Sequence, residues 1–472
     1  MPVYARQRFP ALSSFRAPRD RSSKKLSKER WLGGRSFQSL CGNAGFSSGH
    51  GFIRADNARK SRGFSRSGTI HLPHELFHLG HKNNGAQRPP LAANFPRALV
   101  LYFLCLLNLL CFIFFRNCMR QQNCLTWIVV KKFIPPKHLR NGHLMTIAGS
   151  FWRRSFPRLP ASVTRQFDVE PGTKVRGECH WQPEPKEHPV LVLLHGLEGS
   201  SESGYMLGTA EKAWLAGFNV VRLNQRNCGD TEHLTETLYH SGLSGDIRTV
   251  VLELIERDGL GNIFAAGFSM GGNLVLKMAA EFGDAPPPEL RGFAAVAPAM
   301  DLAGCAAALE EPSNFFYEHR FVRRMKRRMR DKAKMYPHRY QLGRMSHIRT
   351  VRGFDEAITA RFCGFRDAAD YYAKSSANRI IAHIRRPTLI VTAQDDPVVP
   401  FAAFEHPAIR ENPFITLLAP KHGGHCAFIS KEPGEERFWS EARIVEFCAG
   451  QAAMKATKDA AGKGTASQAS RK

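Results

Sequence analysis

The chain has 472 residues and a formal net charge of +26, from 67 lysines and arginines against 41 acidic residues. Residues 1–95 hold 17 basic and 4 acidic residues, so half of the excess charge lies in the first fifth of the chain. The rest is only mildly basic and holds no zinc-finger, RRM or helix-turn-helix pattern. This excludes a nucleic-acid-binding core, and no specific nucleic acid is expected as a partner.

The first 118 residues are expected to lie outside the folded domain. Residues 1–95 are rich in Arg, Ser, Gly and Asn without a hydrophobic period, which predicts a disordered basic arm. Residues 98–115 are uncharged and mostly apolar, so residues 96–118 are expected to form a single-pass membrane anchor. Basic residues flank both ends, which leaves the orientation open. If translation starts at Met119, the next methionine after the first, the arm and anchor are absent and a cytoplasmic protein is expected.

From residue 131 short apolar runs alternate with amphipathic stretches, which predicts one α/β domain over residues 131–450. Strands are expected near residues 163–169, 176–181, 189–194, 219–223, 262–267, 292–297, 387–392 and 414–419. Helical spacing between most of them indicates a mostly parallel sheet with helices on both faces. One helix, at 247–257, is expected to begin after Asp246 as its N-cap. A last helix is expected at 435–448, with a disordered tail over 451–472.

About 90 residues between the strands at 292–297 and 387–392 carry no strand pattern. They predict a helical cap insertion at about 302–380, because a plain connection is much shorter. Within it, RRMKRRMRDKAK (323–334) belongs to a helix with apolar residues at four-residue spacing opposite a dense basic face. That face is either solvated or meets anionic lipid head groups near the mouth of the site.

The motif Gly267-Phe268-Ser269-Met270-Gly271 lies between the strand at 262–267 and a helical pattern at 270–282. A serine between a strand and a helix must occupy a very tight turn. Gly267 and Gly271 allow that turn because a Cβ there would clash with the neighbouring strand and helix. The motif predicts a nucleophile elbow that holds the Ser269 hydroxyl at the end of the sheet.

A serine nucleophile needs a general base, and the base needs a carboxylate. The loop after the strand at 387–392 offers Asp395 and Asp396, and we favour Asp396 because it precedes a Pro-Val-Val-Pro turn. The loop after the strand at 414–419 offers His422 and His425. We favour His425 because the Gly-Gly pair before it lets the backbone bring the ring to the serine.

The oxyanion hole is expected to use two backbone N–H groups, those of Met270 and Leu197. His195, just before Leu197, is interpreted as a structural residue that holds this loop. The eleven cysteines form no C-x-x-C pair, no histidine cluster suits a metal, and no G-x-G-x-x-G follows a strand. No metal site and no cofactor are therefore expected.

These motifs resemble those of the α/β-hydrolase superfamily, and within it the AB hydrolase 4 branch of YheT-like and ABHD-type hydrolases. The similar motifs are GFSMGGN at the elbow, HGLEGSSES (195–203), GFRDAADYYAKSS (364–376), AQDDP and GGHCAF. GHLMTI (142–147) is similar to the branch's HLQT signature, with Met145 in place of the usual glutamine. The resemblance covers about 133–448 and implies the α/β-hydrolase fold.

The same resemblance implies a catalytic triad of Ser269, Asp396 and His425, and activity on carboxylic esters that include medium-chain and glycerolipid esters. The leading hypothesis is a serine-dependent carboxylic ester hydrolase that acts on lipid-like or medium-chain acyl esters through an acyl-serine intermediate. An acyltransferase to an alcohol would use the same triad. Two further alternatives are a catalytically inert membrane-tethered binding protein and a nucleic-acid binder acting through residues 1–95.

Overall fold

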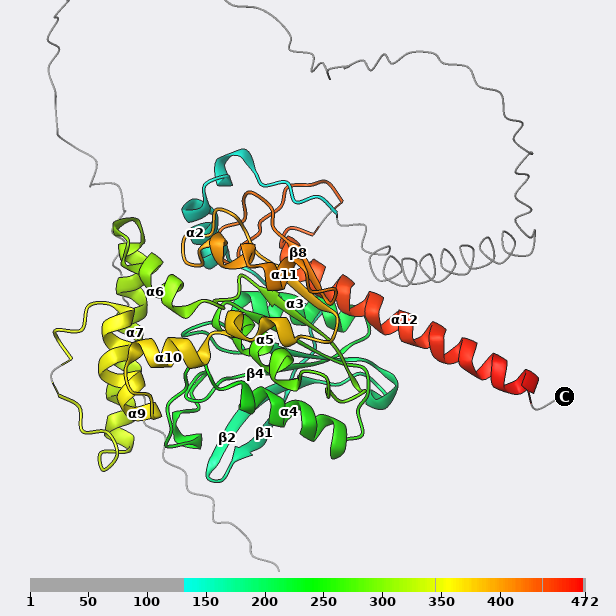
Figure 1. The fold of residues 1–472 in the computed structure, drawn as a ribbon, viewed down its shortest axis with the longest axis horizontal. Coiled ribbons are helices and arrows are strands. Elements are labelled where there is room, and N and C mark those ends of the chain that lie inside the picture. The colour runs from blue at the N-terminus through cyan, green and yellow to red at the C-terminus, as the bar shows by residue number, and fades with distance from the viewer. Residues whose placement is uncertain (1–130, 344, 435, 470–472) are drawn as a thin grey trace, which may run out of the picture. The chain divides into compact units, whose positions relative to one another are not determined.

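The computed structural model describes residues 131–343, 345–434 and 436–469 (Figure 1). The predicted basic arm at 1–95 and the predicted membrane anchor at 96–118 lie outside these residues. Within the described ranges, none of the helices combines the length and the apolar character that crossing a bilayer requires.

An eight-stranded sheet carries the fold, with the strand order β1-β2-β4-β3-β5-β6-β7-β8. Strands β1 and β2 form an antiparallel hairpin, and β2 also pairs with β4 in the antiparallel direction. The remaining neighbouring pairs of the sheet are parallel. The strands are β1 (Val163–Glu170), β2 (Thr173–His180), β3 (Val190–Leu194), β4 (Asn219–Leu223), β5 (Ile263–Phe268), β6 (Leu290–Val296), β7 (Thr388–Val391) and β8 (Ile415–Leu418). The predicted mostly parallel sheet is confirmed.

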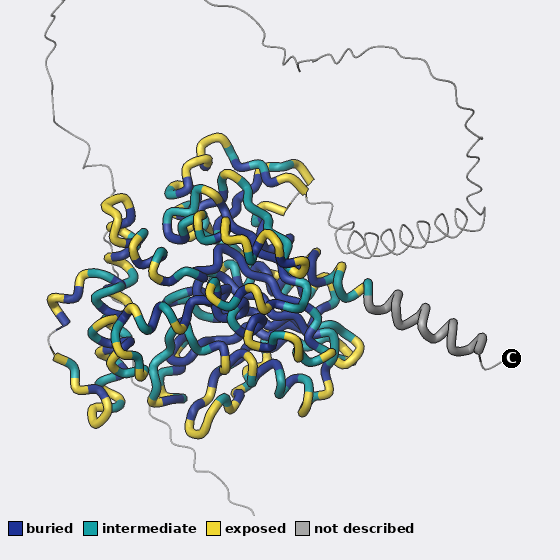
Figure 2. The backbone as a smooth tube through the Cα atoms, in the orientation of Figure 1, coloured by how far each residue is buried: buried dark blue, intermediate teal, exposed yellow. Residues whose placement is uncertain are grey.

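Central strand β3 shows why these apolar runs become strands. All five of its residues are buried, because helices cover both faces of a parallel sheet. Val190 and Val192 pack into one hydrophobic cluster and Leu191 and Leu193 into another, as the two-residue period of a strand requires. Figure 2 shows the strands as the buried centre of the domain.

Two pairs of helices cover the two faces of the sheet. Helices α4 (Ser244–Glu256) and α5 (Met270–Phe282) pack on one face, and their buried side chains continue into the cap. Helices α3 (Gly204–Leu215) and α12 (Trp439–Ala469) pack on the other face. A short N-terminal helix, α2 (Gly142–Phe151), precedes the sheet.

The predicted helical cap is confirmed between β6 and β7, where α7, α9 and α10 lie together on one side of the domain (Figure 1). The cap consists of α6 (Leu302–Glu310), α7 (Phe315–Met335), α8 (Val351–Phe354), a π-helical segment (Asp355–Ala360), α9 (Arg361–Cys363) and α10 (Ala368–Ser375). Helix α7 buries Val322, Met325 and Met329 and exposes most of its arginines. The last short helix, α11 (Pro407–Arg410), precedes β8.

Two local predictions are wrong. Helix α12 does not end near residue 448 but continues to Ala469, so residues 451–469 are helical rather than disordered. The alanine-rich composition of this stretch explains the helix, because alanine has the highest helix propensity. Asp246 is not the N-cap of α4: the cap position is Leu243, and the Asp246 carboxylate instead forms a bidentate pair with Arg226 at 2.6 and 2.5 Å.

Candidate active site

Ser269 lies on the tight turn between β5 and α5. Its backbone is in an unusual conformation, with φ of 52° and ψ of −118°, which L-residues rarely adopt. A Cβ at Gly267 would overlap the carbonyl group of Gly271, and a Cβ at Gly271 would overlap the carbonyl oxygen of His195. Only glycine fits at these two positions, and the strained turn projects the Ser269 side chain out of the helix.

The structure brings Ser269, His425 and Asp396 into one hydrogen-bonded line. The Ser269 hydroxyl lies 3.0 Å from Nε2 of His425, and Nδ1 of His425 lies 2.9 Å from Oδ2 of Asp396. The second carboxylate oxygen of Asp396 accepts the backbone N–H groups of Val398 and Val399 at 2.8 and 3.0 Å. The Pro-Val-Val-Pro turn therefore fixes the carboxylate, and the carboxylate fixes the imidazole.

The charge of Asp396 controls the electrostatics of His425. Burial of the imidazole disfavours its charged form, but the adjacent carboxylate and the hydrogen bond to it outweigh that cost. The pKa of His425 is therefore raised well above its ordinary value. In its neutral form, with the proton on Nδ1, the ring can accept the Ser269 proton at Nε2.

The less favoured residues of the two loops, Asp395 and His422, pair with each other. Nδ1 of His422 lies 3.2 Å from Oδ2 of Asp395, whose other oxygen accepts the N–H of Gly424 at 3.0 Å. These contacts hold the backbone turn that carries His425. Among the described residues, neither Asp395 nor His422 hydrogen-bonds to Ser269.

Leu197 and Met270, the two expected oxyanion donors, line the same cavity as Ser269. The loop before Leu197 lies close to the serine: a Cβ on Gly196 would come within 3.1 Å of the Ser269 Cβ. The Gly196 N–H donates to the Tyr205 hydroxyl at 3.0 Å, which holds the loop in place. In the part of the chain that the structure describes, neither the Leu197 nor the Met270 N–H donates to a protein acceptor. This is compatible with the role expected for these two N–H groups in an oxyanion hole.

His195 is fully buried and its ring belongs to the scaffold of this loop. Its Nε2 accepts the backbone N–H of Gln225 at 3.1 Å, and the Gln225 side chain donates to the His195 carbonyl at 2.6 Å. Burial lowers the pKa of His195 to about 4. The ring is neutral at physiological pH and ties the end of β3 to the loop after β4.

Thr146 supports the histidine, and reasoning from the residues alone did not find it. Its hydroxyl accepts the backbone N–H of His425 at 2.8 Å and donates to the Gly142 carbonyl at 2.7 Å. The only sequence signal was the resemblance of residues 142–147 to a family signature. Met145, which replaces the usual glutamine there, is fully buried in the apolar core.

Asn273 of the elbow motif, also not singled out for a role, connects α5 to the cap. Its side-chain amide donates to the carbonyls of Ser241 and Ser375, both at 2.9 Å, and accepts the N–H of Ala377 at 2.9 Å. All its hydrogen-bonding atoms are used, as a fully buried amide requires. Asn273 therefore holds the C-terminal end of the cap in a fixed position relative to Ser269.

Two cavities meet at Ser269. The first lies under the cap and has a volume of about 110 Å³. Its lining is mostly apolar and includes Leu302, Ala306, Leu309, Met325, Met329 and Phe354. The second is an open groove that Ser269 and His425 also line, between α2, the loop after β3 and α7.

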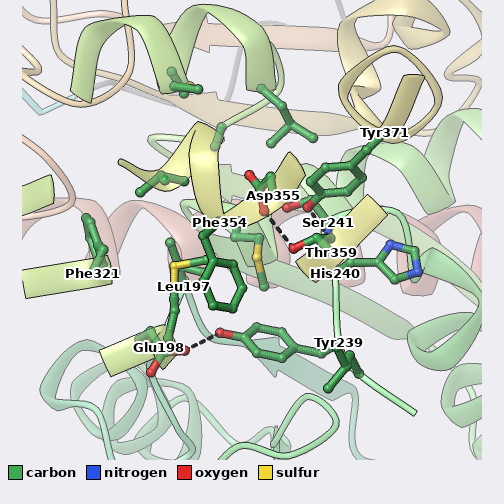
Figure 3. Close-up of a pocket in the computed structure, with 18 of the residues that line it drawn as sticks. Leu197, Glu198, Tyr239, His240, Ser241, Phe321, Phe354, Asp355, Thr359 and Tyr371 are labelled. Carbon is green, nitrogen blue, oxygen red and sulfur yellow. Dashed lines mark hydrogen bonds between the residues drawn. The ribbon is translucent and has the colours of Figure 1, made fainter. Parts of the chain in front are cut away.

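Several polar side chains that line the cavity hydrogen-bond to one another (Figure 3), whereas the buried Oδ1 of Asn227 has no hydrogen-bond partner among the described residues. The hydroxyls of Thr359 and Tyr372 donate to the carboxylate of Asp355 at 2.7 and 2.8 Å, and burial raises the pKa of Asp355 to about 6. The Tyr239 hydroxyl donates to Glu198 at 2.7 Å. Most of the cavity surface is nevertheless apolar, so the interior suits an apolar group.

The described residues include no group of three or more His, Cys, Asp or Glu side chains suited to hold a metal ion.

The class of protein follows from features already described. These are a serine on a strained turn, a histidine and an acid in line with it, and a mostly parallel sheet. The chain belongs to the α/β hydrolase fold family, whose sequence model matches residues 189–432.

Within this family the chain is similar to the putative esterase YheT of Escherichia coli (strain K12), with 30% identity over 67% of this chain and 92% of that protein. Phospholipase ABHD3 of Mus musculus is 27% identical over 51% of this chain and 58% of that protein. The monoacylglycerol lipase of Saccharomyces cerevisiae is 28% identical over 54% of this chain and 57% of that protein. The predicted relation to YheT-like and ABHD-type hydrolases is confirmed.

Proposed function

We propose that the protein is a serine-dependent carboxylic ester hydrolase that acts on lipid-like or medium-chain acyl esters through an acyl-serine intermediate. The observation that carries the proposal is the hydrogen-bonded line from Asp396 through His425 to Ser269, which ends at the junction of the two cavities. The names of the relatives, an esterase, a phospholipase and a monoacylglycerol lipase, support the same reaction type.

In the first half of the reaction, the Ser269 oxygen attacks the ester carbonyl carbon while His425 takes the serine proton at Nε2. The carbonyl oxygen becomes an oxyanion and receives hydrogen bonds from the N–H groups of Leu197 and Met270. Collapse of this intermediate breaks the bond to the alcohol, which leaves with the proton from His425. The acyl group remains on Ser269.

In the second half, water enters from the open groove and His425 takes one of its protons. The hydroxide attacks the acyl-serine carbonyl, and the serine oxygen leaves with the proton from His425. The products are a carboxylic acid and the free enzyme. Asp396 keeps its negative charge throughout, orients the ring and stabilises its protonated form.

The shape of the site supports an acyl chain under the cap and the alcohol part of the ester in the groove. The surface of the cavity under the cap is mostly apolar, which suits a hydrocarbon chain. The groove is more polar and opens to solvent, which suits an alcohol or a polar head group. We therefore expect turnover to rise from acetyl to medium-chain esters.

The test combines labelling of the serine with turnover. The parent protein should react with a fluorophosphonate probe and hydrolyse p-nitrophenyl butyrate and octanoate. Ser269→Ala should lose both the label and at least about 10⁴-fold in kcat, whereas Ser313→Ala, at an exposed serine, should keep them. A folded parent protein that neither labels nor turns over any ester would leave the alternative of an inert binding protein. Formation of ethyl esters in added ethanol, at the expense of free acid, would identify the acyltransferase instead.

A further inference from the structure

Helix α2 and the start of α7 expose large apolar side chains to solvent. Phe151 is 71% exposed and Phe316 is 81% exposed. The complete apolar set is Leu144, Ile147, Phe151, Trp152, Phe315 and Phe316. Exposed apolar clusters of this kind cost hydration free energy, and they mark interaction sites more often than ordinary surface.

These side chains belong to one surface although α2 and α7 are more than 160 residues apart in the chain. The ring of His143 on α2 stacks on the ring of Tyr317 on α7, with centroids 5.8 Å apart. The guanidinium group of Arg320 lies 5.9 Å from the centre of the Phe151 ring. We call this surface, with the exposed arginines of α7 at 320, 323, 324 and 327, the docking face.

The arginines give the docking face a positive charge. Arg324 and Arg327 approach carboxylates only at 3.8 and 3.9 Å. Within the described residues, Arg320 and Arg323 have no carboxylate partner at ion-pair distance. The acidic residue at the start of α7, Glu318, is buried and accepts the N–H of Val351, so it does not neutralise the face.

The docking face adjoins the entrance to the candidate active site. Ile147, Phe151 and Trp152 line the open groove together with Arg320 and Arg324, and Ser269 and His425 lie in the same groove. The docking face therefore lies next to the groove through which a substrate would reach Ser269.

We propose that the docking face binds an anionic lipid surface and so places the groove against the lipid from which the ester substrate enters. This inference rests on the proposed ester hydrolase and specifies where its substrate comes from. Aromatic side chains can insert at the level of the head groups, while arginines pair with anionic lipid phosphates and carboxylates. Nucleic acid would use the arginines but leave the apolar side chains without a partner.

The experiment uses the full chain with vesicles of phosphatidylcholine alone or with phosphatidylserine. The variant Phe316→Ser/Arg323→Glu changes two exposed residues of the docking face that do not line the groove. Its matched control, Leu215→Ser/Arg257→Glu, changes an exposed leucine and an exposed arginine on α3 and after α4. The predicted anchor at 98–115 is common to all three proteins, so the vesicle rates are compared only between them.

Two activities are measured for each protein. Hydrolysis of dissolved p-nitrophenyl butyrate should stay within about twofold in both variants. Hydrolysis of a long-chain ester embedded in anionic vesicles should fall at least tenfold in the docking-face variant and not in the control. Equal rates for the parent protein and the docking-face variant on anionic vesicles would overturn the proposal.

A third measurement does not depend on catalysis. Brominated lipids in anionic vesicles should quench part of the tryptophan fluorescence, and Trp152→Phe should remove that part. If the parent protein shows this quenching but hydrolyses no ester, the proposed function fails and the docking face stands. Absence of quenching from Trp152 overturns the docking face. Self-association that Phe316→Ser abolishes, without such quenching, would instead assign the face to contact between two copies of the chain.

Discussion

Arg328 of cap helix α7 donates to both carboxylate oxygens of Glu198, each at 3.1 Å. Glu198 directly follows Leu197, the expected oxyanion donor, and is almost fully buried with a positive φ of 58°. The Tyr239 hydroxyl donates to the same carboxylate. An ion pair between the cap and the core thus holds the loop beside the nucleophile.

Arg328→Met should destabilise the fold by about 3–5 kcal/mol, because it leaves the buried Glu198 charge without its main partner. The loss should appear as a lower urea midpoint in denaturation followed by circular dichroism. Adding Glu198→Gln should restore at least half of it, since no unpaired charge then remains. A double variant no more stable than the single variant would show that Arg328 acts mainly through packing.

Gly267→Ala should cost at least about 3 kcal/mol of stability, because the added Cβ meets backbone that cannot move aside. Gly245→Ala is the matched control: it lies in helix α4, and a Cβ there has nothing within 4 Å. The control should gain up to about 1 kcal/mol from the higher helix propensity of alanine. Thermal denaturation of the two variants measures both effects, and a fully stable Gly267→Ala would contradict the tight elbow.

Thr146→Val should lower kcat about tenfold with little change in KM. The substitution removes the acceptor for the His425 backbone N–H, and an unsatisfied buried donor costs about 1–3 kcal/mol. Thr146→Ser retains the hydroxyl and should restore most of the rate. If valine and serine behave alike in steady-state kinetics, the hydroxyl does not position the histidine.

Asp396→Asn should reduce kcat by about 10⁴-fold, because the uncharged amide no longer stabilises the correct tautomer and the protonated form of His425. Asp395→Asn should reduce kcat by no more than about tenfold, since Asp395 supports only the turn through Gly424 and His422. The comparison needs only the two single variants and one soluble ester. Equal losses in both would contradict the separate roles.

The raised pKa of His425 predicts the pH dependence of hydrolysis. Only the neutral ring can accept the Ser269 proton, and a raised pKa keeps the ring charged to higher pH. The value of kcat/KM should therefore rise with pH, with a midpoint above the ordinary imidazole pKa of about 6.5. Removing the charge in Asp396→Asn should move that midpoint to lower pH while the maximal rate falls. A parent midpoint at or below 6.5 would contradict the prediction.

The order of the elements and the elbow could be predicted from the sequence, because both depend on local rules. Five apolar residues in a row at β3 have no favourable place except between two layers of helices. The glycines at 267 and 271 mark a turn too tight for any side chain. The end of α12 was misjudged because composition was taken as a sign of disorder, whereas the alanines continue the helix from its packed first turns.

By itself the sequence determined that a serine, then an acid, then a histidine follow the ends of three strands of the sheet, and it left two carboxylates and two imidazoles open. Only the tertiary structure decided which pair lies in line with Ser269, since adjacent residues such as Asp395 and Asp396 differ in the direction of their side chains and not in local propensity. The same holds for Thr146 behind His425, Arg328 against Glu198 and the shared surface of α2 and α7. Each joins segments more than 100 residues apart, and such contacts arise from packing of the whole chain rather than from any local pattern.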